Sequence, residues 1–108
     1  MQEQRAYVRR LIQSEAMIAD ALGENWRRVQ MLDVSRMGLA FASADAMESG
    51  VTHMFNFFLP GNSRRFEVVV KVVHCATNGT VSAFRIGARF VAVDDDTVAL
   101  IAQFTSAA

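Results

Sequence analysis

The chain has 108 residues, of which 52% are hydrophobic and 20% charged, the size and composition of one globular domain and not of a disordered segment. Eleven Lys and Arg residues balance eleven Asp and Glu residues, and this zero net charge argues against a general nucleic-acid-binding surface, which carries a strong positive excess. No apolar run approaches the roughly 18 residues of a membrane span, and no secretory signal is visible. The single cysteine suits a reducing compartment. We therefore expect a cytoplasmic protein without a membrane span or a DNA partner.

The N-terminal segment has two interpretations. Residues 3–22 partly fit an amphipathic helix, with apolar side chains at Tyr7, Leu11, Met17, Ile18 and Leu22. Alternatively, a flexible basic arm over residues 1–10 leads into a first strand over about 11–21. The alanines in this stretch give it only weak strand propensity, and its residues alone leave both interpretations open.

The middle of the chain has the pattern of short strands separated by turns. Glycines recur at positions 23, 38, 50, 61 and 79, a spacing typical of an all-β sandwich or barrel. The segments between them predict strands over Arg27–Asp33, Leu39–Ala42, Val51–Leu59 and Phe66–Ala76. In the first of these, alternation places Val29, Met31 and Asp33 on one side. The sequence Thr77-Asn78-Gly79-Thr80 predicts a hairpin turn.

The last strand and the C-terminal segment differ in periodicity. Over Val81–Val93, apolar residues alternate with Arg85 and Arg89, which indicates one buried face and one solvated face. After Asp94-Asp95-Asp96, the apolar residues have helical spacing, and acidic residues favour a helix N-terminus. We expect a C-terminal helix that covers one opening of the sheet. The core is expected to include Met31, Met37, Met47, Met54, Phe55, Phe57 and Phe58.

Two short motifs carry charged and turn-forming residues. The first is Arg5-x-x-x-Arg9, followed by Arg10, and by itself it is typical of a solvated surface. The second is Asp33-x-Ser35-x-x-Gly38, which includes Arg36. By itself it is typical of a turn in which Asp and Ser cap backbone N–H groups and Gly supplies a positive φ.

In this order, and in a chain of this size and strand content, the two motifs resemble those of the PilZ domain. The segment Gly87-Ala88-Arg89-Phe90 also resembles the family's Gly-x-x-Phe. The resemblance covers nearly the whole chain and favours arm plus strand at the N-terminus. It implies one domain over residues 1–108, an all-β fold with a terminal helix: a flexible arm (1–10), a six-stranded antiparallel β-barrel (11–93) and a C-terminal α-helix (94–105). The implied strands span about 11–21, 26–33, 38–43, 51–59, 66–76 and 80–92.

The resemblance also implies a receptor for the bacterial second messenger cyclic di-GMP, which has two guanines and two phosphates. Arginine matches the O6/N7 edge of guanine, stacks on bases and faces phosphate, while an Asp carboxylate accepts from the N1–H and N2–H₂ donors. The expected ligand-binding residues are Arg5, Arg9, Asp33, Ser35 and Gly38, with Arg10, Arg36 and Gly87 as weaker candidates. An effector protein would read the bound state, to regulate motility, pili or exopolysaccharide.

No catalytic apparatus, cofactor or metal site is expected. Cys75, His53 and His74 are too few and too scattered for a metal site, and adjacent strand residues such as His74 and Cys75 point to opposite faces. Many family members have an Arg where this chain has Gln4, so one alternative is a degenerate module that binds a partner protein without nucleotide. A second alternative, a small β-barrel enzyme using Asp33 and His74, has little support.

Overall fold

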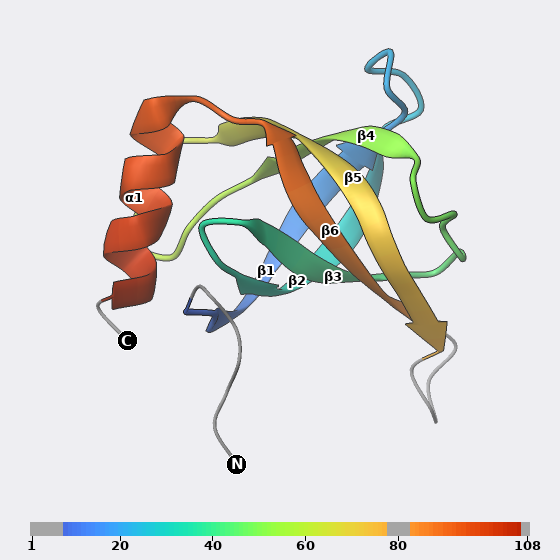
Figure 1. The fold of residues 1–108 in the computed structure, drawn as a ribbon, viewed down its shortest axis with the longest axis horizontal. Helices are drawn as coiled ribbons and strands as arrows, with labels where there is room; N and C mark the ends of the chain where they lie inside the picture. Colours follow the sequence, from blue (N-terminus) through green and yellow to red (C-terminus); the bar gives the residue numbers. More distant parts are fainter. Residues whose placement is uncertain (1–7, 78–82, 107–108) are drawn as a thin grey trace.

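The computed structural model describes residues 8–77 and 83–106, which form a closed barrel with one helix beside it (Figure 1). All neighbouring strands are antiparallel, in the order β1-β2-β3-β6-β5-β4. The elements are β1 (Arg10–Ala19), β2 (Arg27–Val34), β3 (Gly38–Ser43), β4 (Thr52–Phe57), β5 (Phe66–Thr77), β6 (Phe84–Ala92) and α1 (Asp95–Ser106).

The six predicted strands and the C-terminal helix are confirmed, and the helical alternative for residues 3–22 is wrong. Residues 10–19 form β1 because Ile12, Ala16 and Ile18 face the core at spacings of four and two, and a helix would not place Ala16 and Ile18 on one face. The strand expected over 51–59 ends at Phe57, just before Pro60. The expected arm lies largely outside the described residues, and so does most of the hairpin turn at residues 77–80.

Aromatic side chains form the centre of the barrel. Phe41, Phe55, Phe57 and Phe66 follow one another at ring-centroid distances of 5.2, 6.0 and 5.4 Å, and all are fully buried. Ile101 of α1 packs into the same cluster, so the helix covers one end of the barrel as expected (Figure 1). Two predicted core residues are instead on the surface: Met37 is 50% exposed and Phe58 is 43% exposed. Met37 lies in the β2–β3 loop, and Phe58 lies beyond the end of β4.

A bulge in β2 changes the face on which Asp33 lies. Met31 pairs with Phe41 of β3, but Asp33 pairs with Ala40, so the register shifts by one residue between them. Phe41 points into the core, and its neighbour Ala40 therefore points to the outer face. Asp33 shares that face with Ala40, and the predicted alternation that grouped Asp33 with Val29 and Met31 is wrong.

The barrel closes through a short ladder between its first and fourth strands. The pairs are Met17 with Asn56, Ile18 with Phe55 and Ala19 with Met54. The remaining part of β1, residues 10–16, has β2 as its ladder partner. This seam is much shorter than the pairing of β5 with β6, which extends from Val69 to Thr77.

Gly38 is required by the contact between β3 and β6. A Cβ atom at this position would lie 2.1 Å from the Ala88 carbonyl oxygen and 2.7 Å from the Arg89 Cα. The positive φ that the turn interpretation gave to Gly38 is not observed; positive-φ glycines in the described residues are Gly23, Gly50 and Gly61. The absence of a side chain at Gly38 therefore permits close strand packing.

Helix α1 is held at both ends by polar contacts. The Asp94 carboxylate accepts a hydrogen bond from the Thr97 backbone N–H at 2.7 Å, an N-cap interaction that lowers the pKa of Asp94. At the other end, Arg10 of β1 donates to the Phe104 carbonyl at 2.8 Å, and its guanidinium lies 4.1 Å from the Phe104 ring centroid. The start of the barrel and the end of the helix are thereby joined.

Replacing Gly38 with alanine should destabilise the fold, because the new methyl group would collide with the backbone of β6. We expect a cost of about 1–3 kcal/mol in the free energy of unfolding, the scale for overpacking. The matched control is Gly87→Ala, since a Cβ there would lie at an ordinary 3.6 Å from the His74 Cβ. Urea denaturation measures both variants, and equal stabilities would contradict this role for Gly38.

The Asp94 cap should make stability depend on pH. Its pKa is lowered in the folded state, so the cap stabilises above the ordinary pKa of Asp, and this contribution is lost as pH falls through the folded value. Asp94→Asn keeps an accepting oxygen but does not titrate, and Asp94→Ala has neither property. When the pH is lowered from about 5 to about 2, we expect the melting temperature of Asp94→Asn to fall less than that of the wild type. Identical pH profiles would be evidence against the cap.

Candidate functional site

Asp33 is a buried carboxylate on the outer face of the barrel. The residue is 4% exposed, and its Oδ2 accepts a hydrogen bond from Nη2 of Arg85 at 2.9 Å. Its Oδ1 lies 3.5 Å from Nη1 of Arg9 as an ion pair, but accepts no hydrogen bond from any described residue. A buried polar atom without a hydrogen bond is costly, so Oδ1 is an acceptor site for an incoming donor.

The loop after β2 is fixed by hydrogen bonds among its own residues. The Ser35 backbone N–H donates to the Gly38 carbonyl at 2.8 Å, and the Ser35 hydroxyl accepts from the Met37 N–H at 3.1 Å. The Met37 carbonyl in turn accepts from the Phe90 N–H of β6 at 2.8 Å. Ser35 therefore holds the loop as the turn interpretation expected, whereas Asp33 pairs with arginines.

The two consecutive arginines at the start of β1 have different partners. Arg9 is directed to Asp33, whereas Arg10 is engaged with Phe104 of α1. The structure thus brings Arg9 next to the second motif and gives Arg10 a helix-anchoring contact. Arg36 is exposed on the β2–β3 loop, and Arg5 lies outside the described residues.

A row of paired residues connects Asp33 to the far strands. Asp33 pairs with Ala40, Ala40 with Gly87, and Gly87 with His74, so the row crosses β2, β3, β6 and β5. Paired residues share a face of the sheet, and the two central residues are small. Gly87 therefore belongs to the same outer face as Asp33 and lies between Asp33 and His74.

The groups that an enzyme or metal site would need are not brought together. His74 is exposed on the outer face, whereas Cys75 packs against the core, so the two point apart as predicted. Within residues 8–77 and 83–106, no group of three or more His, Cys, Asp or Glu side chains could hold a metal ion. In the same ranges, no helix is both long and apolar enough to cross a membrane.

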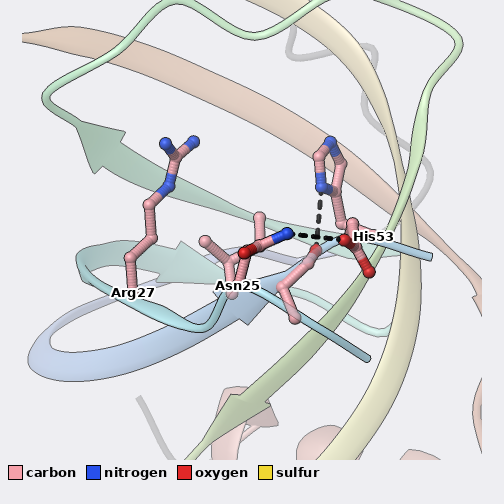
Figure 2. Close-up of a pocket in the computed structure, with 6 residues that line it drawn as sticks. Asn25, Arg27 and His53 are labelled. Atoms are coloured by element: carbon pink, nitrogen blue, oxygen red, sulfur yellow. Dashed lines mark hydrogen bonds between the residues drawn. The ribbon is translucent and has the colours of Figure 1, made fainter. Parts of the chain in front are cut away.

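A separate pocket of about 180 Å³ lies at the β1–β2 turn (Figure 2). His53 contacts the Ala19 carbonyl at 2.9 Å through Nδ1, and Asn25 donates to Asp20 at 3.1 Å. The Glu24 backbone N–H is the main group that lowers the pKa of Asp20. Arg27, also in this pocket, pairs with Asp45 at 2.8 Å. These polar groups satisfy one another, and none of the predicted ligand-binding residues lies here.

A family comparison covers the same stretch of chain as the barrel, the helix and both motifs: the model of the PilZ domain matches residues 3–107. The chain belongs to the PilZ domain family. PilZ domains are non-catalytic receptors for cyclic di-GMP, in agreement with the expectation that the chain is not an enzyme. No curated protein matches the sequence.

Several solved structures share this fold at low sequence identity. Bacillus subtilis inhibitor of motility (MotI/DgrA) superimposes with a TM-score of 0.86 at 18% identity, over 97% of this chain and 51% of that protein. The PilZ domain of Escherichia coli YcgR with c-di-GMP gives 0.75 at 13% identity, over 97% and 91%. Borreliella burgdorferi PlzA in complex with c-di-GMP gives 0.67 at 16%, over 94% and 41%. The chain spans about half the length of MotI/DgrA.

Arg85 is the residue of this candidate site that the sequence interpretation missed. It was identified only as part of the solvated face of its strand, and its bond to Asp33 joins residues 52 apart in sequence. The alternation of residues 84–90 did predict that Arg85 points outward. Its partner could be found only by knowing that β6 pairs with β3 and that the β2 bulge turns Asp33 outward.

Proposed function

We propose that this PilZ domain binds cyclic di-GMP on the outer face of the barrel, at Asp33 and the β2–β3 loop. The observation that carries the proposal is the Asp33 carboxylate, which is buried and has an oxygen, Oδ1, without a hydrogen-bond donor among the described residues. The guanine edge offers adjacent N1–H and N2–H₂ donors, which suit a carboxylate that only accepts. Gly87, which has no side chain, lies on the same outer face.

Cations near the loop suit the two phosphates of the ligand. Arg9 forms an ion pair with Asp33. Arg89 of β6 lies opposite Gly38 of β3 and Lys71 of β5 in the strand ladders. Like charges directly opposite one another on neighbouring strands are destabilising, and a bound dianion would offset the repulsion between Arg89 and Lys71. Ser35 shapes the loop, Arg36 lies on it, and Arg5 is proposed as a further cation. Arg10 is the weakest candidate because α1 engages it.

Binding would change the N-terminal segment through Arg9. In the free chain, Arg9 is paired with the carboxylate that guanine requires. When a guanine N–H donates to Asp33 Oδ1, it displaces the Arg9 guanidinium, which then binds the ligand's base or phosphate. The surface around Arg9 changes as a result, and an effector protein reads the altered surface to regulate motility, pili or exopolysaccharide.

Asp33→Asn should weaken binding of cyclic di-GMP and lower the preference for it over cyclic di-AMP. The amide keeps the shape of the side chain but offers one accepting oxygen in place of two. We expect a loss of about 1–3 kcal/mol in binding free energy, measured by titration calorimetry. The control is Asp45→Asn, because Asp45 is also paired with an arginine but its side chain is 67% exposed and lies away from the site. Unchanged guanine preference in Asp33→Asn would contradict the assigned role.

Arg9→Lys should bind cyclic di-GMP more weakly although the charge is kept, because lysine can neither fork to a base edge nor stack on it. Loss of one hydrogen bond to a charged group predicts a decrease in affinity on the order of tenfold. Arg27→Lys is the matched control, since the side chains of Arg9 and Arg27 are both 43% exposed and both are paired with Asp. Wild-type affinity in Arg9→Lys would show that charge alone matters. A wild-type chain that binds no cyclic di-GMP would favour the partner-protein module without nucleotide.

A further inference from the structure

We propose that Arg85 is a positioning residue that orients Asp33 for guanine and so sets the selectivity of the site. The inference rests on the proposed function, because it assigns a role in the recognition of the same ligand. The inference is based on a difference between the two oxygens of the buried Asp33 carboxylate. Oδ2 accepts a hydrogen bond from Arg85 at 2.9 Å, and Oδ1 has no hydrogen bond among the described residues.

Arg85 reaches Asp33 from a strand that is not its neighbour. It belongs to β6, where it pairs with Ala42 of β3, and Asp33 belongs to β2, where it pairs with Ala40 of β3. Two strand spacings, about 9.5 Å, separate the backbones. The Arg85 side chain thus spans β3, and alanine at both intervening positions leaves a path for it.

The bond fixes the plane of the carboxylate. A guanine edge donates two roughly parallel hydrogen bonds, so the accepting carboxylate must lie close to the plane of the base. Asp χ2 is a broad torsion with little intrinsic preference, and an external bond is needed to hold it. Arg85 supplies this bond at Oδ2, which keeps a second lone pair for a guanine donor, and Oδ1 has no hydrogen bond among the described residues.

Arg85 also limits competition from Arg9. Both arginines contact the same carboxylate, but only Arg85 donates a hydrogen bond to it, whereas Arg9 forms an ion pair at 3.5 Å from Oδ1. Without Arg85, both oxygens would be available to Arg9, whose fork matches a carboxylate bidentately. This bidentate Arg9–Asp33 pair would occupy both carboxylate oxygens, to which guanine would otherwise donate. Removing Arg85 therefore weakens recognition although it removes no group that must touch the ligand.

The comparison pair Arg27–Asp45 separates this role from an ordinary ion pair. The side chains of Arg85 and Arg27 are 44% and 43% exposed, and their nitrogen–oxygen distances are 2.9 and 2.8 Å. The carboxylates differ, since the Asp33 side chain is 6% exposed and that of Asp45 is 67% exposed. Loss of Arg27 leaves a hydrated carboxylate, whereas loss of Arg85 leaves a buried one whose orientation is no longer fixed.

The test is titration calorimetry of the full chain with cyclic di-GMP and cyclic di-AMP. We expect Arg85→Gln to lower the affinity for cyclic di-GMP about tenfold, the scale of a hydrogen bond to a charged group, and to reduce selectivity over cyclic di-AMP. Arg27→Gln should change neither quantity. Arg85→Lys, which keeps a positive charge beside the buried carboxylate and therefore preserves folding, should recover part of the selectivity.

A double-mutant cycle tests whether Arg85 acts through Asp33. If it does, Arg85→Gln has little further effect on cyclic di-GMP affinity in a chain that already carries Asp33→Asn. Additive losses would mean that Arg85 contacts the ligand itself, and they would overturn the positioning role. Selective binding by the wild type together with unchanged selectivity in Arg85→Gln and Arg85→Lys would overturn this inference alone. A wild-type chain that binds neither nucleotide would overturn the proposed function as well.

Discussion

The bulge in β2 is the feature on which the candidate site depends. A regular strand would place Asp33 with Met31 in the core, where a charged carboxylate would be surrounded by aromatic rings. The inserted residue turns Asp33 to the outer face and lets the next inward position, Val34, complete the core. One local irregularity therefore keeps the carboxylate out of the barrel's interior and places it as a buried acceptor on the outer face.

Three arginine side chains make different contacts in this fold. Arg10 ties the barrel to α1, Arg85 bonds to Asp33 across β3, and Arg9 forms a longer ion pair with the same carboxylate. The ability of arginine to form planar, multiple hydrogen bonds suits all three positions. Position along the fold, more than residue type, therefore decides which partner each arginine contacts.

Local patterns in the sequence predicted most of the fold. Alternation, β-branched residues and turn signals identified five strands and the helix, because each depends on neighbours within a few residues. β1 needed the family resemblance, since its alanines fit helix and strand equally well. The bulge at Asp33 and the Arg85–Asp33 bond could not be predicted, because both depend on how distant strands are paired. Gly38 was singled out correctly as a position that needs glycine, but the reason is the backbone of β6, which no local pattern contains.

The short seam between β1 and β4 has a consequence for how the protein avoids self-association. A closed barrel normally leaves no free sheet edge, but here β1 continues past the ladder with β4 over residues 10–16. An unprotected edge of this kind can recruit a strand from another molecule. The stretch carries Arg10 and Glu15 and the polar residues Gln13 and Ser14, and charged side chains along an edge disfavour such pairing. The charged and polar residues of this segment therefore disfavour pairing of β1 with a strand from another molecule.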